Sequence, residues 1–228
     1  KSENIEIWSD GTRMQGNLFI PQDSSVKKWP TILLAHGWGG LKSHLNQSYA
    51  PKFAAAGYLV MTFDYRGWGE SDSRLVVYGD MPKPGRFNNT ISVKATAIRD
   101  LVDPLDQYED IQASLYFLEG DDRVDSERIA IWGSSFGGGH AVMTGASDPR
   151  IKVIVSQVGS MGAGMENYAQ DLKKRLIAQA RKEEDPVPQG IDMQPGLRGT
   201  PHYGRMSIYQ PITRAKDIKV PTLIVDAE

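Results

Sequence analysis

The sequence predicts an α/β fold with a mostly parallel central sheet and helices on both of its faces. Short continuous apolar runs are typical of strands buried on both faces, and such runs occupy residues 31–35, 58–63, 128–132, 151–155 and 220–225. Segments with apolar residues at helical spacing lie between several of these runs. Because strand and helix alternate in this rhythm, we expect parallel strands joined by helical crossovers.

The first part of the chain predicts a hairpin and a helix. Residues 4–8 and 14–20 alternate apolar and polar side chains around a turn at 9–12, which indicates an antiparallel hairpin at a sheet edge. Residues 46–56 have the pattern of a helix, and Gly57 is expected to end it.

The middle of the chain predicts a loop and two further helices. Residues 73–90 contain prolines and glycines without clear periodicity, so we expect a long loop near the functional site. Residues 97–118 have helical spacing, but Pro104 divides them into a loop and a helix. Residues 137–144 are mostly small, as in a helix packed tightly on a sheet.

The segment 159–219 does not follow the alternation, and we expect it to be a lid inserted into the fold. Residues 165–181 can form one amphipathic helix, whereas residues 183–209 are rich in proline, glycine and methionine and have no clear regular pattern. Four methionines would suit either an adaptable apolar wall of a substrate pocket or a small core of the lid itself: Met161, Met165, Met193 and Met206.

Length and composition favour one domain with one sizeable core, since the chain has 228 residues of which 40% are hydrophobic. The predicted division is a core of residues 1–158, a lid or cap of residues 159–219 and a returning core strand in 220–228. A net charge of −2 gives no electrostatic footprint for nucleic acid or a membrane surface. The chain has no cysteine, which excludes thiolate catalysis.

The stretch Gly133-Ser134-Ser135-Phe136-Gly137 follows the apolar run 128–132 and carries the main chemical prediction. A serine between glycines on a sharp strand-to-helix turn has a strained backbone and an exposed hydroxyl, and the next N–H can point at a reacting carbonyl. We therefore expect Ser135 to be a nucleophile. The alternative is a chance match in a chain with 23 glycines.

At this stretch the chain resembles the α/β-hydrolase fold superfamily, and within it the dienelactone-hydrolase-like and acyl-peptidase-like serine hydrolases. The segment His36-Gly37-Trp38-Gly39-Gly40 is similar to the superfamily's loop after its third strand. The resemblance implies an oxyanion hole formed by the backbone N–H groups of Trp38 and Phe136. The turn at 64–72 is also similar to the superfamily, and we expect it to be architectural or, alternatively, to bind a polar substrate group.

The resemblance also implies a catalytic acid and histidine in the chain order Ser, acid, His. Neither is expected among the residues of this chain, because both would lie beyond residue 228 and Glu228 falls slightly before the usual acid position. The chain's own histidines are expected to be structural, with His202 the most plausible substitute: His36, His44, His140 and His202. We interpret the sequence as C-terminally truncated, and the alternative is a protein that has lost catalysis.

The function that the resemblance implies is hydrolysis of a small-molecule carboxylic ester, thioester or lactone through a Ser135 acyl-enzyme. No metal or organic cofactor is expected. The alternatives are a carbon–carbon or amide bond hydrolase on the same fold and a non-catalytic binding protein. We further expect no nucleic-acid partner, no membrane association, a possible homodimer and a cytoplasmic location, although a leader before Lys1 would not be visible.

Overall fold

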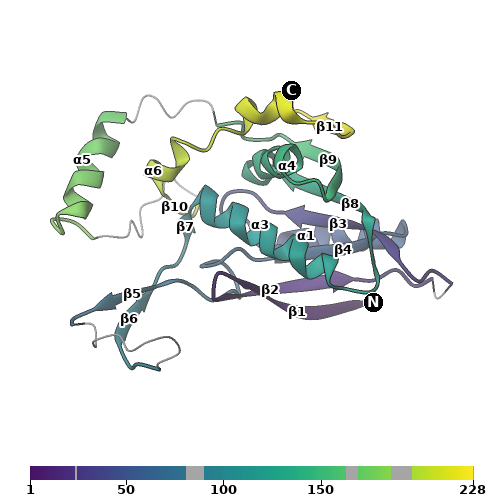
Figure 1. Cartoon of the computed structure of the whole chain (residues 1–228), viewed down its shortest axis with the longest axis horizontal. Helices are drawn as coiled ribbons and strands as arrows, with labels where there is room; N and C mark the ends of the chain where they lie inside the picture. Colours follow the sequence, from purple (N-terminus) through teal and green to yellow (C-terminus); the bar gives the residue numbers. More distant parts are fainter. Residues whose placement is uncertain (24, 81–89, 163–168, 186–196, 228) are drawn as a thin grey trace.

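A seven-stranded sheet forms the centre of the computed structural model, which describes residues 1–23, 25–80, 90–162, 169–185 and 197–227 (Figure 1). Its strands lie in the order β1-β2-β4-β3-β8-β9-β11. Their bounds are β1 Ser2–Ser9, β2 Thr12–Phe19, β3 Trp29–Ala35, β4 Leu59–Phe63, β8 Val124–Ser134, β9 Ile151–Gln157 and β11 Thr222–Val225.

The sheet is mostly parallel, as predicted. β4, β3, β8, β9 and β11 pair in parallel, while β1 and β2 form an antiparallel hairpin at one edge, with β2 antiparallel to β4. The other edge is β11, where Leu223 and Ile224 are both more than half exposed.

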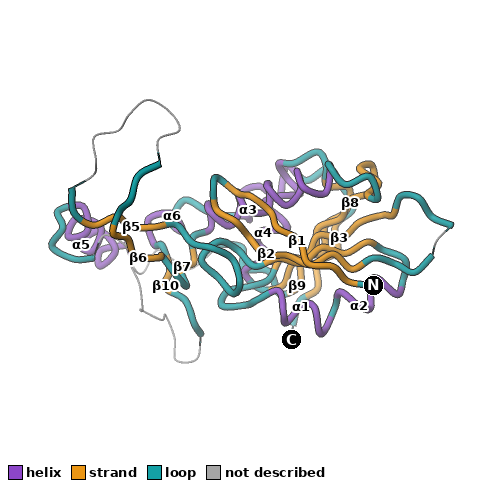
Figure 2. Tube along the Cα trace, turned by 90° about the horizontal axis from the view of Figure 1, so that it is seen from below, coloured by secondary structure: helices purple, strands orange, loops and turns teal. Residues whose placement is uncertain are grey.

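The helices are α1 Lys42–Ser48, α2 Ala50–Ala55, α3 Pro104–Glu119, α4 Phe136–Ser147, α5 Ala169–Ala180, α6 Tyr203–Met206 and the 3₁₀ helix η2 Pro211–Asp217. Figure 2 shows α3 and α4 on one face of the sheet and α1 and α2 on the other. The predicted α/β fold with helices on both faces is therefore confirmed.

Alternating side chains of the central strands explain why both faces are covered. On β3, Leu33 belongs to the large apolar cluster that includes α3, whereas Ile32 and Leu34 belong to the smaller cluster under α1 and α2. The same alternation places Ile131 of β8 in the first cluster and Trp132 in the second. Successive residues of a strand point to opposite faces, so a continuous apolar run requires a helical layer on each side.

Two predicted elements differ in the structure. The helix expected at 46–56 is two short helices, and the break falls at Tyr49, just before Pro51 in the first turn of α2. Proline lacks the backbone N–H that would continue the α1 ladder, which accounts for the break.

The loop expected at 73–90 is wrong in part, because β5 Leu75–Tyr78 pairs with β6 Lys94–Ala97 in an antiparallel hairpin. The proline- and glycine-rich stretch that suggested a loop lies after β5, and residues 81–89 lie outside the described residues. A further small pairing joins β7 Leu101–Val102 to β10 Thr200–Pro201.

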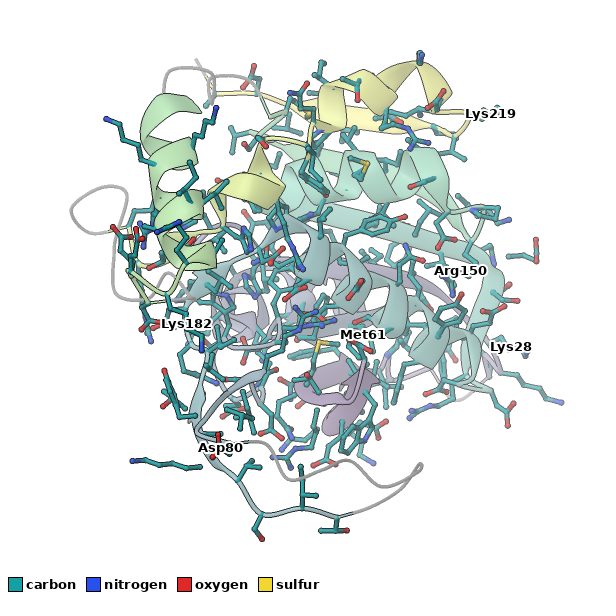
Figure 3. The ribbon with its side chains drawn as sticks, turned by 60° about the vertical axis from the view of Figure 1, so that its left-hand side comes forward. Lys28, Met61, Asp80, Arg150, Lys182 and Lys219 are labelled. Atoms are coloured by element: carbon teal, nitrogen blue, oxygen red, sulfur yellow. The ribbon has the colours of Figure 1, made fainter. Side chains whose placement is uncertain are left out.

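Figures 1 and 2 both place α5, α6 and the β5–β6 hairpin at one end of the molecule, beyond the sheet. In Figure 3, Lys182 just after α5 and Asp80 just after β5 mark two separate projections at this end. The helix expected at 165–181 is observed as α5 over Ala169–Ala180, and residues 163–168 lie outside the described residues. The division into a core and a lid at 159 and 219 stays a prediction.

Candidate active site

Ser135 lies at the turn between β8 and α4, in the strand–turn–helix context that the sequence predicts. Its φ of 56° and ψ of −122° place a non-glycine residue in a rarely populated region of backbone space. The turn is fixed by hydrogen bonds: the Ser135 N–H donates to Gln157 O at 2.9 Å, and Ser135 O accepts from Gly138 and Ser160 N–H, each at 2.9 Å. Ser135 is exposed, although Phe136 beside it is buried.

The glycines that flank Ser135 are required by close backbone contacts. A Cβ on Gly133 would lie 2.0 Å from Gly137 O, and a Cβ on Gly137 would lie 2.3 Å from Ala35 O. No side chain fits at such distances, so the turn and the start of α4 can pack against β3 only with glycine at both positions.

The loop at residues 36–40 lies directly against this turn. Ala35 of β3 pairs with Gly133 of β8, so Gly37 and Ser135 each lie two residues beyond the last paired position. A Cβ on Gly37 would lie 3.0 Å from Ser135 Cβ and 3.4 Å from Phe136 N. The parallel pairing of β3 and β8 thus brings together the two segments that the sequence singled out.

The orientation of the Trp38 N–H is held through the Gly37 carbonyl. Gly37 O accepts hydrogen bonds from Gly40 N–H at 3.0 Å and from His36 Nδ1 at 3.0 Å, which assigns the proton of that imidazole to Nδ1. Because the peptide unit is planar, fixing the Gly37 carbonyl also fixes the Trp38 N–H. Within the described part of the chain, neither this N–H nor that of Phe136 donates to a protein acceptor.

Three of the histidines have structural contacts, as predicted. Burial lowers the pKa of His140 to about 3, and its Nε2 donates to Gln107 Oε1 at 2.9 Å while its Nδ1 accepts from the Tyr209 hydroxyl at 2.5 Å. Burial also lowers the pKa of His36 to about 4. His44 Nδ1 accepts from the Leu41 N–H at 3.2 Å. Both buried imidazole rings are therefore neutral near pH 7.

His202 lies at a different place, in the wall of a cavity of about 170 Å³ that charged side chains dominate. Arg205 in this wall forms ion pairs with Asp103 at 2.8 Å and Asp106 at 2.7 Å, and Arg74 pairs with Asp106 at 2.7 Å. Asp103 and Asp106 are therefore paired with Arg74 and Arg205, whereas Arg66 in the same wall pairs with Asp110 and has a buried Nη1 without a partner among the described residues.

The turn at residues 64–72 makes the architectural contacts that the sequence analysis expects. Asp64 accepts from the backbone N–H groups of Lys42 at 2.7 Å and Glu70 at 3.0 Å, which ties the start of α1 to the turn. Arg66 is buried and forms a 2.7 Å ion pair with Asp110, which is fully buried. Since these groups are engaged inside the protein, the structure favours the architectural role over binding of a polar substrate group.

A second, smaller cavity of about 50 Å³ borders the serine turn. It is lined by Trp38, Pro104, Phe136, Ser160, Gly162, Met206 and Tyr209. The rings of Trp38 and Phe136 meet edge to face with centroids 5.7 Å apart. Of the four methionines singled out, Met206 lines this cavity, whereas Met165 and Met193 lie outside the described residues.

Sequence reasoning missed Tyr209, Gln107 and Pro104 as parts of this site. The Tyr209–His140–Gln107 hydrogen bonds join residues that are 69 and 33 positions apart in the chain. No local pattern could have signalled such contacts.

Within the described residues, no group of three or more His, Asp or Glu side chains is arranged to hold a metal ion. Nor does any helix among them have the length and hydropathy needed to cross a bilayer.

The sheet topology and the serine turn at the carboxyl end of strand β8 define the α/β-hydrolase class. The α/β hydrolase GrgF from Penicillium sp. sh18 has the same fold, with a TM-score of 0.73 and 18% identity over 99% of this chain and 80% of that one. The family model of the X-Pro dipeptidyl-peptidases (S15 family) matches residues 10–173. The chain belongs to this family.

Two named relatives are similar over most of this chain. The quorum-quenching protein AidA of Acinetobacter baumannii is 29% identical over 67% of this chain and 43% of its own length. The thiohydrolase aneE of Aspergillus aculeatus is 26% identical over 77% of this chain and 46% of its own length. The chain thus spans less than half the length of either relative.

Proposed function

We propose that this protein is a serine hydrolase that cleaves a carboxylic ester, thioester or lactone of a small molecule through a Ser135 acyl-enzyme. The observation that carries the proposal is an exposed Ser135 on a strained turn between two free backbone N–H groups. Ser135 Oγ attacks the carbonyl carbon and gives its proton to a base, and the bond to the alcohol or thiol breaks as that group takes the proton. Water then cleaves the acyl-enzyme in the same way.

The N–H groups of Trp38 and Phe136 are the proposed oxyanion hole. Attack on the carbonyl places negative charge on its oxygen, and preorganised N–H donors stabilise that charge. Each such donor contributes about 3–4 kcal/mol to the transition state in related sites. The double hold on the Gly37 carbonyl supports this role for Trp38, because a donor that is already oriented needs no reorganisation during the reaction.

The general base stays a prediction. His140 has both ring nitrogens engaged, whereas His36 donates from Nδ1 to Gly37 O and its buried Nε2 has no partner among the described residues. The catalytic acid stays a prediction as well.

The proposed lid, residues 159–219, is supported by its contacts with the oxyanion loop. A Cβ on Gly39 would lie 2.8 Å from Arg198 O, and a Cβ on Gly199 would lie 3.2 Å from Trp38 Nε1. Arg198 and Gly199 thus lie against the loop that holds the proposed N–H donor. The cytoplasmic location and the homodimer also stay predictions.

The relative aneE and the matched family point to two different classes of substrate. The thiohydrolase aneE favours a thioester, whereas the description of the family as X-Pro dipeptidyl-peptidases keeps peptide-bond hydrolysis as the second candidate. An assay of matched p-nitrophenyl ester, thioester and X-Pro anilide substrates distinguishes these alternatives.

The test of the nucleophile is labelling by a fluorophosphonate, followed by intact-mass and peptide mapping of the protein that the gene encodes. We expect one adduct, on Ser135. Ser135→Ala should lose the adduct and at least about 10⁴-fold in kcat/KM, because a triad serine acts as part of a unit. Ser134→Ala is the matched control and should keep both. Full turnover by Ser135→Ala, or an adduct on another serine, contradicts the assignment.

A further inference from the structure

The small cavity beside Ser135 lies where one substituent of a reacting carbonyl would go. It is bordered by Trp38 and Phe136, the two residues whose N–H groups form the proposed oxyanion hole. Ser160, which also lines it, donates its N–H to Ser135 O. A carbonyl carbon bonded to Ser135 Oγ, with its oxygen at the two N–H groups, is therefore next to this cavity.

Most of the residues that line the cavity are apolar and bulky, although Ser160 carries a hydroxyl and the buried Trp38 Nε1 has no hydrogen-bond partner among the described residues. Pro104, Phe136 and Met206 contribute hydrocarbon and thioether surface, and the hydroxyl of Tyr209 is already donated to His140. A pocket with no free charged group favours an apolar substituent over a polar or ionised one.

The cavity is also small. An apolar cavity of about 150 Å³ holds a benzene molecule. At about 50 Å³, this cavity has room for one or two carbon atoms. A longer or branched acyl chain fits only if the wall moves.

The wall is held on both sides of Met206. Arg205, its neighbour on α6, bonds Asp103 at 2.8 Å and Asp106 at 2.7 Å at the start of α3. Tyr209 lies three residues after Met206, and its hydroxyl bonds His140 of α4. Met206 itself is buried and packs into the large apolar cluster. Residues 205–209 are thus bonded to two core helices, α3 and α4, and Met206 lies between these bonds and closes the cavity.

We propose that this cavity takes the acyl substituent of the substrate, that the acyl group is short and unbranched, such as acetyl or propionyl, and that Met206 sets this limit. The inference rests on the proposed serine hydrolase function and deepens it by naming the acyl class.

The test is the acyl-chain profile of kcat/KM on p-nitrophenyl esters from acetyl to octanoyl. The wild-type protein should prefer acetyl or propionyl over hexanoyl by at least about tenfold, since one misplaced methylene in an apolar pocket is worth about 10–200-fold. Met206→Ala removes the Cγ, Sδ and Cε atoms from the wall and should raise the hexanoyl-to-acetyl ratio by at least about tenfold.

A second variant acts in the opposite direction and does not depend on a core substitution. Ser160 is exposed and lines the cavity, so Ser160→Leu should fill it and lower the propionyl-to-acetyl ratio. Met143→Ala, at a partly buried methionine of α4 outside the cavity wall, is the matched control and should keep the wild-type profile.

The outcomes separate this inference from the proposed function. Equal turnover of acetyl and octanoyl esters by the wild-type protein, or an unchanged profile in both folded Met206→Ala and Ser160→Leu proteins, overturns the inference and leaves the serine hydrolase intact. Absence of any phosphonate adduct on Ser135 overturns both.

Discussion

Gly37→Ala is the substitution that examines the proposed oxyanion hole most directly. The new methyl group would lie 2.8 Å from Ser134 O, 3.0 Å from Ser135 Cβ and 3.4 Å from Phe136 N. Two of these distances are at or below the closest contacts that a Cβ makes, and the first atom belongs to the backbone. The loop must therefore move away from the serine turn by several tenths of an ångström.

That movement takes the Trp38 N–H away from the reacting oxygen without removing any catalytic side chain. Loss of one oxyanion donor costs about 10²–10³ in kcat, equivalent to about 2.7–4 kcal/mol. Since partial displacement sets this as an upper bound, we expect a loss of about 10–10³-fold. KM should change little, because the hydrogen bond strengthens only in the transition state.

The assay is steady-state hydrolysis of p-nitrophenyl acetate by Gly37→Ala and by a matched control, Gly120→Ala. A Cβ on Gly120 meets its nearest neighbours at 3.6 Å, and the residue ends α3 with an ordinary φ of −83°. The control should keep wild-type kcat. Thermal unfolding of both variants checks that they remain folded. A kcat for Gly37→Ala within about threefold of wild type would refute the reasoning, since a clash between the oxyanion loop and the serine turn would then have no catalytic consequence.

Two further predictions concern stability. The depressed pKa values of His36, about 4, and His140, about 3, mean that the unfolded chain takes up protons first as the pH falls from 7. Each histidine should cost about 2 kcal/mol between pH 7 and pH 5, offset by about 1 kcal/mol because burial raises the pKa of Asp110 to about 6. Urea unfolding should therefore show that the free energy of unfolding is about 3 kcal/mol lower at pH 5 than at pH 7. His140→Gln should make this difference smaller. Equal free energies of unfolding at the two pH values would contradict the prediction. Asp110→Asn removes the buried carboxylate that pairs with the buried Arg66 guanidinium, leaving it the Ser9 hydroxyl and the exposed Glu109, and should cost about 3–5 kcal/mol of unfolding free energy. Glu109→Gln, at the exposed partner 3.3 Å away, should cost less than about 1 kcal/mol. Equal losses of unfolding free energy in the two variants would show that burial of the Arg66–Asp110 pair does not determine its contribution to stability.

The central sheet could be predicted from the sequence because its strands are buried on both faces. A run such as residues 31–35 needs no partner to be recognised, since continuous apolar character is itself the consequence of two helical layers. The β5–β6 hairpin could not be predicted in the same way. Its strands are only partly buried, so neither carries a strong periodic pattern. In addition, β5 ends at Tyr78 and its partner β6 begins only at Lys94, so no short turn in the sequence indicates the pairing.

The same distinction applies to the candidate site. The serine turn and the glycine loop could be predicted because each is a contiguous motif whose geometry is set by its own residues. The cavity wall could not, because Pro104, Ser160 and Met206 come from segments far apart in the chain. Their meeting depends on how α3 and α6 pack, which no local spacing encodes. The Asp103–Arg205 ion pair, between residues 102 positions apart, is a contact of this kind.

The two N–H donors and the cavity wall should respond differently to substitution, because they are positioned by different parts of the fold. Trp38 and Phe136 each lie three residues beyond the paired positions Ala35 and Gly133, so the relative placement of the two N–H donors follows from the β3–β8 register. The lid touches these two segments through backbone groups, because Arg198 O lies against Gly39 and the Ser160 N–H donates to Ser135 O. The lid supplies side chains, above all Met206, that decide which acyl group reaches the donors. Substitutions in the lid should therefore change the preferred ester while leaving kcat for the smallest one nearly constant, because the register that positions the reaction lies elsewhere in the fold.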